Sequence, residues 1–216
     1  MTAPEAPRST DVHRDRVGGL WDDIGRLQID FLRAQGLAPG QTLLDVGCGC
    51  LRGGVHFVPF LDHGNYYGLD IDADLLRAGV DVELPRAGLA GRVPADHLLV
   101  NDAFEAWRFG VVFDVAWAHS LFTHLPAAEV RRCLVEVSRC VRPGGRFFAT
   151  FFAAGEDVAR PVTHQPGGIV TRPDQDPYHY RFRDLAALCD GLPWRPVDVG
   201  DWHQPRAQHM ARFDRE

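Results

Sequence analysis

The sequence predicts a doubly wound α/β domain, in which a mostly parallel sheet carries helices on both faces. Short apolar runs of strand length alternate with amphipathic stretches of helical period along most of the chain. The first such run, 43–46, passes directly into a glycine-rich turn, as a buried parallel strand does when it leads into a helix. Two strand candidates at 194–199 and 208–213 have no helix between them, so we expect the sheet to end in a hairpin.

Length and composition indicate one domain with a small-molecule partner. The chain has 216 residues, 45% of them hydrophobic, which suffices for one sizeable core. We expect a flexible arm at 1–11, where Pro, Ser and Thr are frequent, and a single domain at 12–216. A formal net charge of −6 gives no electrostatic footprint for nucleic acid or an anionic membrane, so neither is expected as a partner.

Cysteine usage and the absence of long apolar runs predict a cytoplasmic protein. The five cysteines are odd in number, and a disulfide at Cys48 or Cys50 would distort the glycine turn, so reduced thiols are expected. No stretch has the layout of a signal peptide or the length of a membrane span.

The predicted elements follow one another in regular order. An amphipathic helix begins near Val17 and ends at Gly36, and the strand at 43–46 is followed by a helix at 55–60. A strand at 66–72, a helix at 73–78, a strand at 97–100 and a short helix at 104–108 come next. A strand at 113–118, a helix that starts at Pro126, a strand at 146–152 and a short helix at 183–189 complete the alternation.

The turn after the first strand has the chemistry of a ligand site. Gly47 and Gly49 allow positive φ and have no Cβ, so the main chain can approach a ligand closely. In a dinucleotide-binding turn the third glycine would stand where this chain has Arg52. Asp45 at the end of the strand would repel a pyrophosphate and attract an ammonium group.

The segment LLDVGCGCLRGG resembles the first motif of the class I S-adenosylmethionine (SAM) dependent methyltransferases, and its GCGCLRGG part resembles a small bacterial type. The resemblance implies a seven-stranded sheet with an antiparallel C-terminal strand, and SAM as the cofactor. It implies that Asp45, Gly47, Cys48 and Gly49 contact this cofactor, with Asp45 attracting the methionine ammonium. Arg52 is expected to meet the methionine carboxylate, the alternative being an exposed helical arginine.

Two further turns extend the expected cofactor site. Asp70 closes the second strand 21 residues after Gly49, where it can accept both hydroxyls of a ribose, and Ile71 would offer an apolar face to adenine. Asp70 could instead cap the next helix, although Asp72 is the better candidate for the cap.

The end of the third strand is expected to contact the adenine amine through Asp102 and a ring nitrogen through the Ala103 N–H, as at the matching position in the family. The alternative for Asp102 is to cap the short helix at 104–108.

Histidines and aromatic residues supply candidates for the acceptor side. His119 and His124 follow the fourth strand, at the edge where the winding order of the sheet reverses, and the resemblance also places His119 beside the cofactor. The segment 153–180 lacks a hydrophobic period and is a candidate lid and acceptor loop, with His179 near its end. We rank His119 and His179 ahead of His124 as a proton acceptor, each with a purely structural role as the alternative. The expected acceptor-binding residues are Trp21, His124, Tyr178, Tyr180 and Trp202.

These observations predict a methyltransferase that acts on an oxygen or nitrogen of a small molecule, as a monomer or homodimer. The alternative is a protein that binds SAM without transfer, or that uses SAM in another reaction. No metal site is expected, because Cys48 and Cys50 lack the usual ligand spacing and no H-E-x-x-H segment exists.

Overall fold

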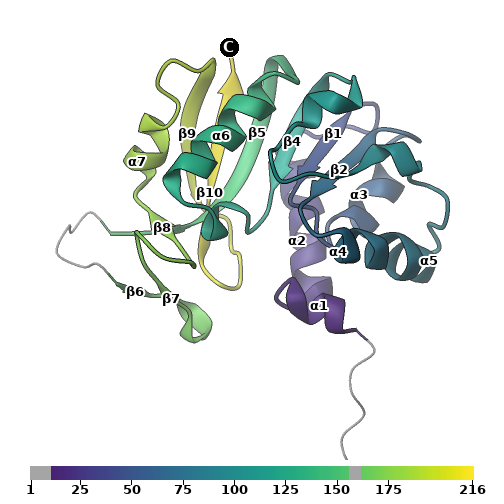
Figure 1. Cartoon of the computed structure of the whole chain (residues 1–216), viewed down its shortest axis with the longest axis horizontal. Coiled ribbons are helices and arrows are strands. Elements are labelled where there is room, and N and C mark those ends of the chain that lie inside the picture. Colours follow the sequence, from purple (N-terminus) through teal and green to yellow (C-terminus); the bar gives the residue numbers. More distant parts are fainter. Residues whose placement is uncertain (1–10, 156–161) are drawn as a thin grey trace, which may run out of the picture.

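The computed structural model describes residues 11–155 and 162–216 and is built around a single large β-sheet (Figure 1). Seven strands lie in the order β3-β2-β1-β4-β5-β10-β9, and β8 pairs with β5 beside this path. Strands β1 to β5 are parallel, whereas β10 runs antiparallel to both β5 and β9. The strands are β1 (Leu43–Val46), β2 (Tyr66–Asp70), β3 (Leu98–Val100), β4 (Phe113–Ala118), β5 (Val141–Ala153), β8 (His179–Tyr180), β9 (Trp194–Asp201) and β10 (Gln208–Arg215). The predicted doubly wound sheet with an antiparallel C-terminal strand is confirmed, with the short β8 as an addition.

Helices cover both faces of the sheet. The α-helices are α1 (Val12–Arg16), α2 (Trp21–Ala34), α3 (Gly54–Phe60), α4 (Ala73–Ala78), α5 (Leu84–Arg86), α6 (Ala127–Ser138) and α7 (Phe182–Ala187). The π-helical turn η1 (Gly79–Glu83) joins α4 to α5, and the short 3-10 turns are η2 (Ala95–His97), η3 (Ala106–Phe109), η4 (Phe122–His124) and η5 (Pro166–Gly168). The helix expected at 104–108 is therefore the 3-10 turn η3. None of the helices in the described ranges is long and apolar enough to cross a membrane.

Alternation along the strands gives each face its own core. Phe147 of β5 belongs to the cluster under α6 and α7, whereas the next residue, Phe148, belongs to the cluster under α2, α3 and α4. Because consecutive side chains of a strand point to opposite faces, one strand supplies both layers. Trp117 of β4 is fully buried in the second cluster, where its Nε1–H donates to Oε1 of Gln28 at 2.8 Å.

The N-terminal region contains two helices where the sequence predicted one that began near Val17. Gly18 and Gly19 have φ of +88° and +63°, and the break between α1 and α2 extends to Leu20 at +48°. The glycines adopt this left-handed backbone readily, so the chain turns between two helices that share one apolar spacing. We call residues 11–20, which comprise α1 and this turn, the N-terminal strap.

The segment predicted as an irregular loop at 153–180 contains short elements. Strands β6 (Thr163–His164) and β7 (Val170–Thr171) form a small antiparallel pair, and β8 follows. In β8, His179 pairs with Phe152 and Tyr180 with Ala153, beyond the point where β4 leaves β5. The strap and the β6–β7 pair thus lie at the same end of the sheet as the carboxyl ends of the parallel strands (Figure 1).

Candidate active site

A cavity of about 440 Å³ lies at the carboxyl ends of the parallel strands. This volume is within the range of sites for cofactors and drug-sized ligands. Its wall is built from the turns after β1, β2 and β4, the strap, the 153–180 segment and the loop between β9 and β10. The lining residues are Arg16, Val17, Gly18, Gln28, Asp45, Gly47, Cys48, Gly49, Arg52, Gly53, Asp70, Leu75, His119, Ser120, Leu121, Thr123, His124, Phe152, Ile169, Pro177, Arg206 and Gln208.

Backbone geometry requires glycine at two positions of the turn after β1. Gly47 and Gly49 have φ of +74° and +54°, which side-chain-bearing residues rarely adopt. A Cβ at Gly49 would lie 2.9 Å from Cγ1 of Val17, and one at Gly47 would lie 3.1 Å from Cδ1 of Leu121. The missing side chains therefore let the strap and the turn after β4 close onto this turn.

Asp45 lies at the floor of the cavity, where its carboxyl is buried. The hydroxyl of Tyr66 donates a hydrogen bond of 2.9 Å to its Oδ2. Burial raises the pKa of Asp45 to about 7, and the nearby Asp70 adds to the rise, while the Tyr66 hydrogen bond and Arg52 oppose it. A cationic group entering the cavity would favour the ionised form of this carboxyl.

Asp70 links the first two turns of the sheet. Its Oδ2 accepts the Gly49 N–H at 2.7 Å, and its Oδ1 accepts the Asp72 N–H at 2.8 Å. Burial raises the pKa of Asp70 in spite of these two hydrogen bonds. Asp72 caps α4 by accepting the N–H groups of Asp74 and Leu75, so the cap belongs to Asp72 and Asp70 faces the cavity.

Arg52 is buried in the cavity wall, which excludes the alternative of an exposed helical arginine. Its Nη1 donates to the carbonyl oxygens of Val17 and Gly19, both at 2.9 Å, and its Nη2 donates to Nδ1 of His119 at 3.2 Å. Burial lowers the pKa of Arg52 to about 10. Arg52 thus fixes the strap over the cavity while one of its donors, the buried Nε–H, has no partner among the described residues.

His119 has the environment of a neutral hydrogen-bond donor. Burial, together with Arg52 and Arg206, holds its pKa well below the usual value. Because Arg52 can only donate, Nδ1 of His119 is the acceptor and the ring proton is on Nε2. This buried Nε2–H has no acceptor in the part of the chain that the structure describes.

Ser120 follows His119 in a left-handed conformation, with φ of +58°. Its N–H donates to Thr150 Oγ1 at 2.7 Å, and its hydroxyl exchanges hydrogen bonds with the Gln208 side-chain amide. Non-glycine residues with positive φ concentrate at functional sites, where the surroundings hold them in place. This network joins β4, β5 and β10 at the cavity.

His124 forms a second polar group at the cavity, beside Pro177 of the 153–180 segment. Its Nδ1 lies 2.7 Å from Oδ1 of Asp176, and both side chains are more than half exposed. The carboxylate orients the ring, so Nε2 is the nitrogen left for a ligand.

The predicted site residues divide into two groups. Asp45, Gly47, Cys48, Gly49, Arg52, Asp70, His119 and His124 all line the cavity. Ile71 and Asp102 are exposed at the ends of β2 and β3, outside the cavity lining, and the Ala103 N–H donates to Oδ1 of Asn101 at 2.9 Å. Their adenine contacts stay predictions.

The remaining acceptor candidates are not brought into the cavity lining. His179 is buried with Nδ1 on Thr171 Oγ1 at 2.9 Å, and the hydroxyl of Tyr180 donates to the Leu125 carbonyl. The backbone N–H of Tyr178, which directly precedes β8, donates to the Thr123 carbonyl at 2.7 Å. Trp202 packs its ring on Trp117 and His119.

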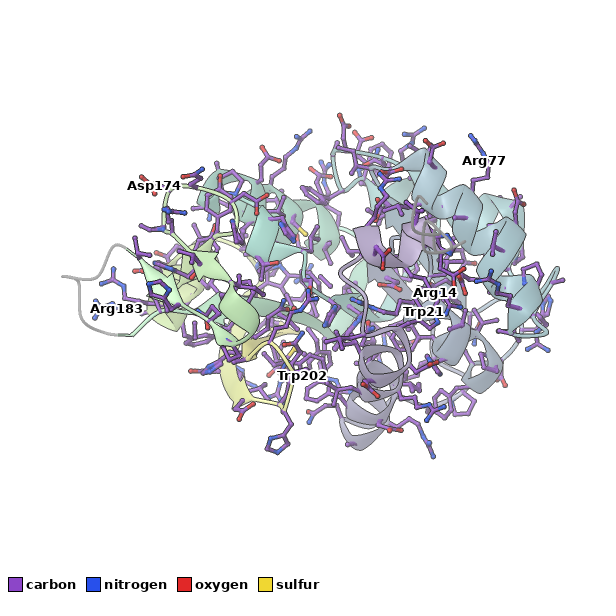
Figure 2. All side chains as sticks on the ribbon, turned by 90° about the horizontal axis from the view of Figure 1, so that it is seen from below. Arg14, Trp21, Arg77, Asp174, Arg183 and Trp202 are labelled. Atoms are coloured by element: carbon purple, nitrogen blue, oxygen red, sulfur yellow. The ribbon has the colours of Figure 1, made fainter. Side chains whose placement is uncertain are left out.

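Trp21 begins α2, where Arg14 lies over its ring at 4.4 Å (Figure 2). It too lies outside the cavity lining. Instead, Ile169 and Pro177 bring the 153–180 segment to the cavity.

Residues that sequence reasoning missed come mainly from the strap and the last hairpin. Gln28 and Gln208 are buried polar residues in otherwise apolar stretches, and this mismatch was the available signal. Arg16, Val17 and Gly18 carry no such signal, because their place depends on how the strap lies over the sheet.

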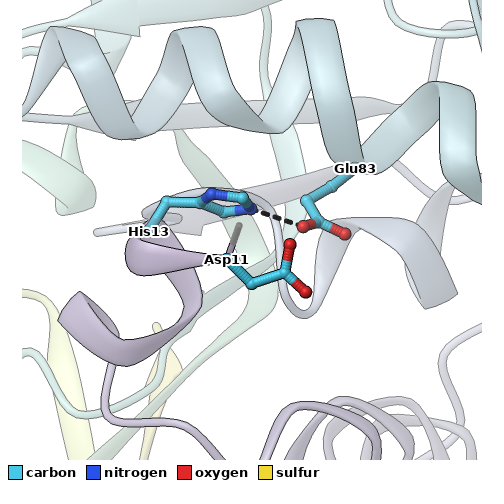
Figure 3. A group of neighbouring side chains, drawn as sticks. All are labelled: Asp11, His13 and Glu83. Carbon is cyan, nitrogen blue, oxygen red and sulfur yellow. Dashed lines mark hydrogen bonds and ion pairs between the residues drawn. The ribbon is translucent and has the colours of Figure 1, made fainter. Parts of the chain in front are cut away.

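The strap is anchored by a cluster of charged groups that joins it to Glu83 (Figure 3). Asp11, His13 and Glu83 offer ligand atoms within 4.8 Å of one another, and His13 Nε2 lies 2.5 Å from Glu83 Oε1. Arg14 donates to both oxygens of Glu83, and Arg86 pairs with Asp11. Two guanidinium groups already balance the two carboxylates, so the cluster has the composition of an ion-pair anchor. Arg16 adds a further pair with Asp72.

A family model described as "Methyltransferase domain" matches residues 44–147, the part that carries β1 to β5. Among curated proteins, the chain is 25% identical over 196 residues to 2-methyl-6-phytyl-1,4-hydroquinone methyltransferase of Synechocystis sp. (85% of this chain, 58% of that protein). It is 34% identical over 148 residues to nocamycin O-methyltransferase of Saccharothrix syringae (63% of this chain, 48% of that protein). The chain therefore spans only 58% and 48% of the lengths of these relatives.

Among solved structures, the chain is similar to SAM-bound CalS10, an amino pentose methyltransferase from Micromonospora echinaspora. The TM-score is 0.66 with 18% sequence identity, and 100% of each chain is covered. At this identity the likeness concerns the fold. The sequence match over 44–147 and the order and direction of the strands support a class I SAM-dependent methyltransferase of the small bacterial type.

Proposed function

We propose that this protein transfers a methyl group from SAM to an oxygen or nitrogen of a small-molecule acceptor. The observation that carries the proposal is the arrangement of Asp45, the Gly47–Gly49 turn and Asp70 along one wall of the cavity. A buried carboxyl with a raised pKa suits an ammonium group, and a carboxylate 21 residues beyond Gly49 suits a ribose.

The chain's own residues fit the groups of SAM. Gly47 and Gly49 line the cavity with positive φ and no side chain, so a ligand can approach the main chain of this turn closely. The unpartnered, buried Nε–H of Arg52 is a donor for a carboxylate, as expected for the methionine end. Asp70 keeps a second lone pair on each oxygen for ribose hydroxyls.

SAM, when bound, supplies an electrophilic methyl group and leaves as a neutral thioether. The protein's tasks are therefore to hold the acceptor atom in line with that methyl group and to take up its proton. Holding is the larger task, because intramolecular geometry alone can supply several kcal/mol, about 7–11 in favourable cases.

As the group that takes up the proton of the acceptor atom, His124 is favoured by the geometry over His119 and His179, which the sequence ranked first. His119 is neutral with its proton on Nε2, and His179 lies outside the cavity lining with Nδ1 on Thr171. His124 lines the cavity, and Oδ1 of Asp176 lies 2.7 Å from its Nδ1, which orients the ring and leaves Nε2 for the acceptor. We therefore assign the uptake of the acceptor's proton to Nε2 of His124. His119 instead positions Arg52 through its hydrogen bond.

The named activities of the relatives support a small-molecule acceptor. One relative is an O-methyltransferase of nocamycin, another acts on a hydroquinone, and the structural neighbour acts on an amino pentose. Oxygen is named as the methylated atom for the nocamycin enzyme, and an amino pentose has both hydroxyl and amino groups, so both atoms are included in the proposal.

The test is calorimetric titration with S-adenosylhomocysteine (SAH), followed by incubation with methyl-labelled SAM and a panel of small hydroxy and amino compounds. We expect SAH to bind and label to appear in a small product. Binding without transfer to any compound would favour the alternative, a protein that binds SAM for another purpose. No binding at all would refute the proposal.

A further inference from the structure

We infer that the methyl acceptor carries a carboxylate, which Arg206 binds from the loop between β9 and β10. This inference rests on the proposed function, because it assigns Asp45, Arg52 and Asp70 to SAM. It concerns the acceptor's anchoring group, not the atom that is methylated.

Arg206 is a cation without a counter-ion at the cavity. It lines the cavity and donates through Nη2 to the Gly18 carbonyl, and no carboxylate of the described residues pairs with it. By contrast, Arg195 and Arg212 on the adjoining strands both pair with Asp214. A guanidinium that has only one carbonyl partner retains N–H donors for a ligand carboxylate.

A buried donor without an acceptor lines the same cavity. The Nε2–H of His119 has no partner among the described residues, and His119 is about nine-tenths buried. The Nε1–H of Trp202 and the side-chain amide of Gln204, in the same loop as Arg206, also lack partners, but both residues lie outside the cavity lining. A buried N–H group that lacks an acceptor is costly, and an anionic oxygen in the cavity could satisfy the one on His119.

The two carboxylates that line the cavity, Asp45 and Asp70, form no ion pair with Arg206. We assign them to the ammonium and ribose of SAM. Arg206 lies near Arg52, because the two guanidinium groups donate to neighbouring carbonyls of residues 17–19. SAM has one carboxylate, which we assign to Arg52, so Arg206 is left for a carboxylate of the acceptor.

The rest of the acceptor side limits the size and character of the ligand. Leu121, Phe152, Ile169 and Pro177 give it an apolar lining, and the whole cavity of about 440 Å³ must also hold SAM. A compact acceptor with an apolar body and one carboxylate fits this description better than a bulky phosphate ester does.

The test uses the full chain saturated with SAH, titrated with benzoate and with benzamide as its neutral match. We expect benzoate to bind about tenfold or more tightly than benzamide, because a charge-assisted hydrogen bond is lost in the amide. Arg206→Gln should abolish the preference, Arg206→Lys should keep part of it, and the SAH affinity of both should stay within about threefold of wild type. Arg195→Gln is the matched control and should behave as wild type.

Equal binding of the two probes, or binding of neither, would overturn the inference. Loss of SAH binding in Arg206→Gln would mean that Arg206 serves the cofactor instead. If SAH itself does not bind wild type, the proposed function fails, and the same titration without SAH still tests Arg206. A labelled product that mild alkali hydrolyses would be a methyl ester, which would make the carboxylate the acceptor and contradict its anchoring role.

Discussion

The hydroxyl of Tyr66 donates a hydrogen bond of 2.9 Å to Oδ2 of Asp45 beneath the cavity, and this is the one hydrogen bond in the described residues that the Asp45 side chain receives. Burial raises the pKa of Asp45 to about 7, so near neutral pH the ligand-free protein contains both forms of this carboxyl. Its ionisation and the binding of a cationic ligand must therefore be coupled.

Cofactor binding should depend on pH through Asp45. Below pH 7 the carboxyl is mostly protonated, so binding of the SAH ammonium should release a proton, and affinity should rise about tenfold from pH 6 towards pH 7.5. Tyr66→Phe removes a hydrogen bond that favours the ionised form, so it should move this rise to higher pH. Calorimetry in buffers of different ionisation enthalpy measures the proton release. If no proton is released when SAH binds at pH 6, Asp45 does not bind the ammonium group of the ligand. Asp45→Asn is the control, because its side chain does not titrate.

The stability of the ligand-free protein should also respond to Asp45. Its folded pKa of about 7 lies above the usual value of 3.8, so the folded state binds the extra proton between these values. Stability should therefore fall as pH rises from about 4 to about 7. Denaturant unfolding of wild type and Asp45→Asn over this range measures the difference, and parallel pH profiles would argue against a buried carboxyl.

Gly49→Ala should impair cofactor binding more than it impairs folding. The added Cβ would lie 2.9 Å from Val17 Cγ1, and the left-handed backbone costs about 1–2 kcal/mol for alanine. We expect SAH affinity to fall more than tenfold. Gly91→Ala is the matched control, since Gly91 also has positive φ, at +72°, with no atom within 4 Å of its added Cβ. Equal SAH affinities in the two variants would show that the turn at Gly49 is not a ligand contact.

Glu83→Gln should loosen the strap. Burial would raise the pKa of Glu83, but the hydrogen bonds from Arg14 and His13 outweigh it and hold this pKa below its usual value. Breaking a buried ion pair costs about 3 kcal/mol or more, so the amides of α1 should exchange hydrogen faster and SAH should bind more weakly.

The matched control for Glu83 is Asp74→Asn. Asp74 pairs with Arg77 on the exposed face of α4, and its loss should change stability by less than about 0.5 kcal/mol. Because the folded pKa of Glu83 is depressed, its stabilisation should be complete above the usual pKa of 4.5 and be lost as pH falls through the folded value. Unchanged exchange in α1 would mean that the anchor does not hold the strap.

His124→Ala should slow methyl transfer without weakening SAH binding. A positioned general base contributes about 10²–10⁴ in rate, and Asp176→Asn should show a smaller loss because it only orients the ring. His179→Ala should leave turnover nearly unchanged, although it will cost some stability through the lost bond to Thr171. Single-turnover rates separate these effects from binding. If the His124 variant turned over at the wild-type rate, orientation alone would drive the reaction.

The sheet could be predicted from the sequence because its signals are local. Each parallel strand is a short apolar run that ends in a polar turn, and the glycine turn after β1 identifies where the ligand site begins. The sequence predicted that the first helix begins near Val17, because apolar positions continue at helical spacing across Gly18 and Gly19, whereas α2 begins at Trp21 and α1 precedes Val17. Strands of two residues, such as β6 and β8, are too short to show a period.

The candidate site was predictable on one wall and much less so on the other. The residues after β1 and β2 are close in sequence and have fixed offsets, whereas Arg206 and Pro177 reach the cavity only through the packing of β8 and β10 against β5. The ranking of His119, His124 and His179 as proton acceptors depends on how deeply each side chain is buried, which the sequence does not show. Nothing in the sequence indicates that Arg52 would contact His119 and that Asp176 would contact His124.

The pairing of Tyr180 with Ala153 makes the intervening segment an insertion whose two ends meet on the sheet. The Ala154 N–H donates to the Tyr180 carbonyl at 2.9 Å, so the chain leaves β5 and returns beside it. Changing the length of a segment changes the free energy of closing it only slowly, by about 0.6 kcal/mol for each doubling. Residues between Ala154 and His179 can therefore be lengthened, shortened or exchanged between relatives without moving the strands that hold the turn after β1. Under the proposed function, acceptor preference could diverge by replacement of this one segment, while the residues assigned to the cofactor stay as they are.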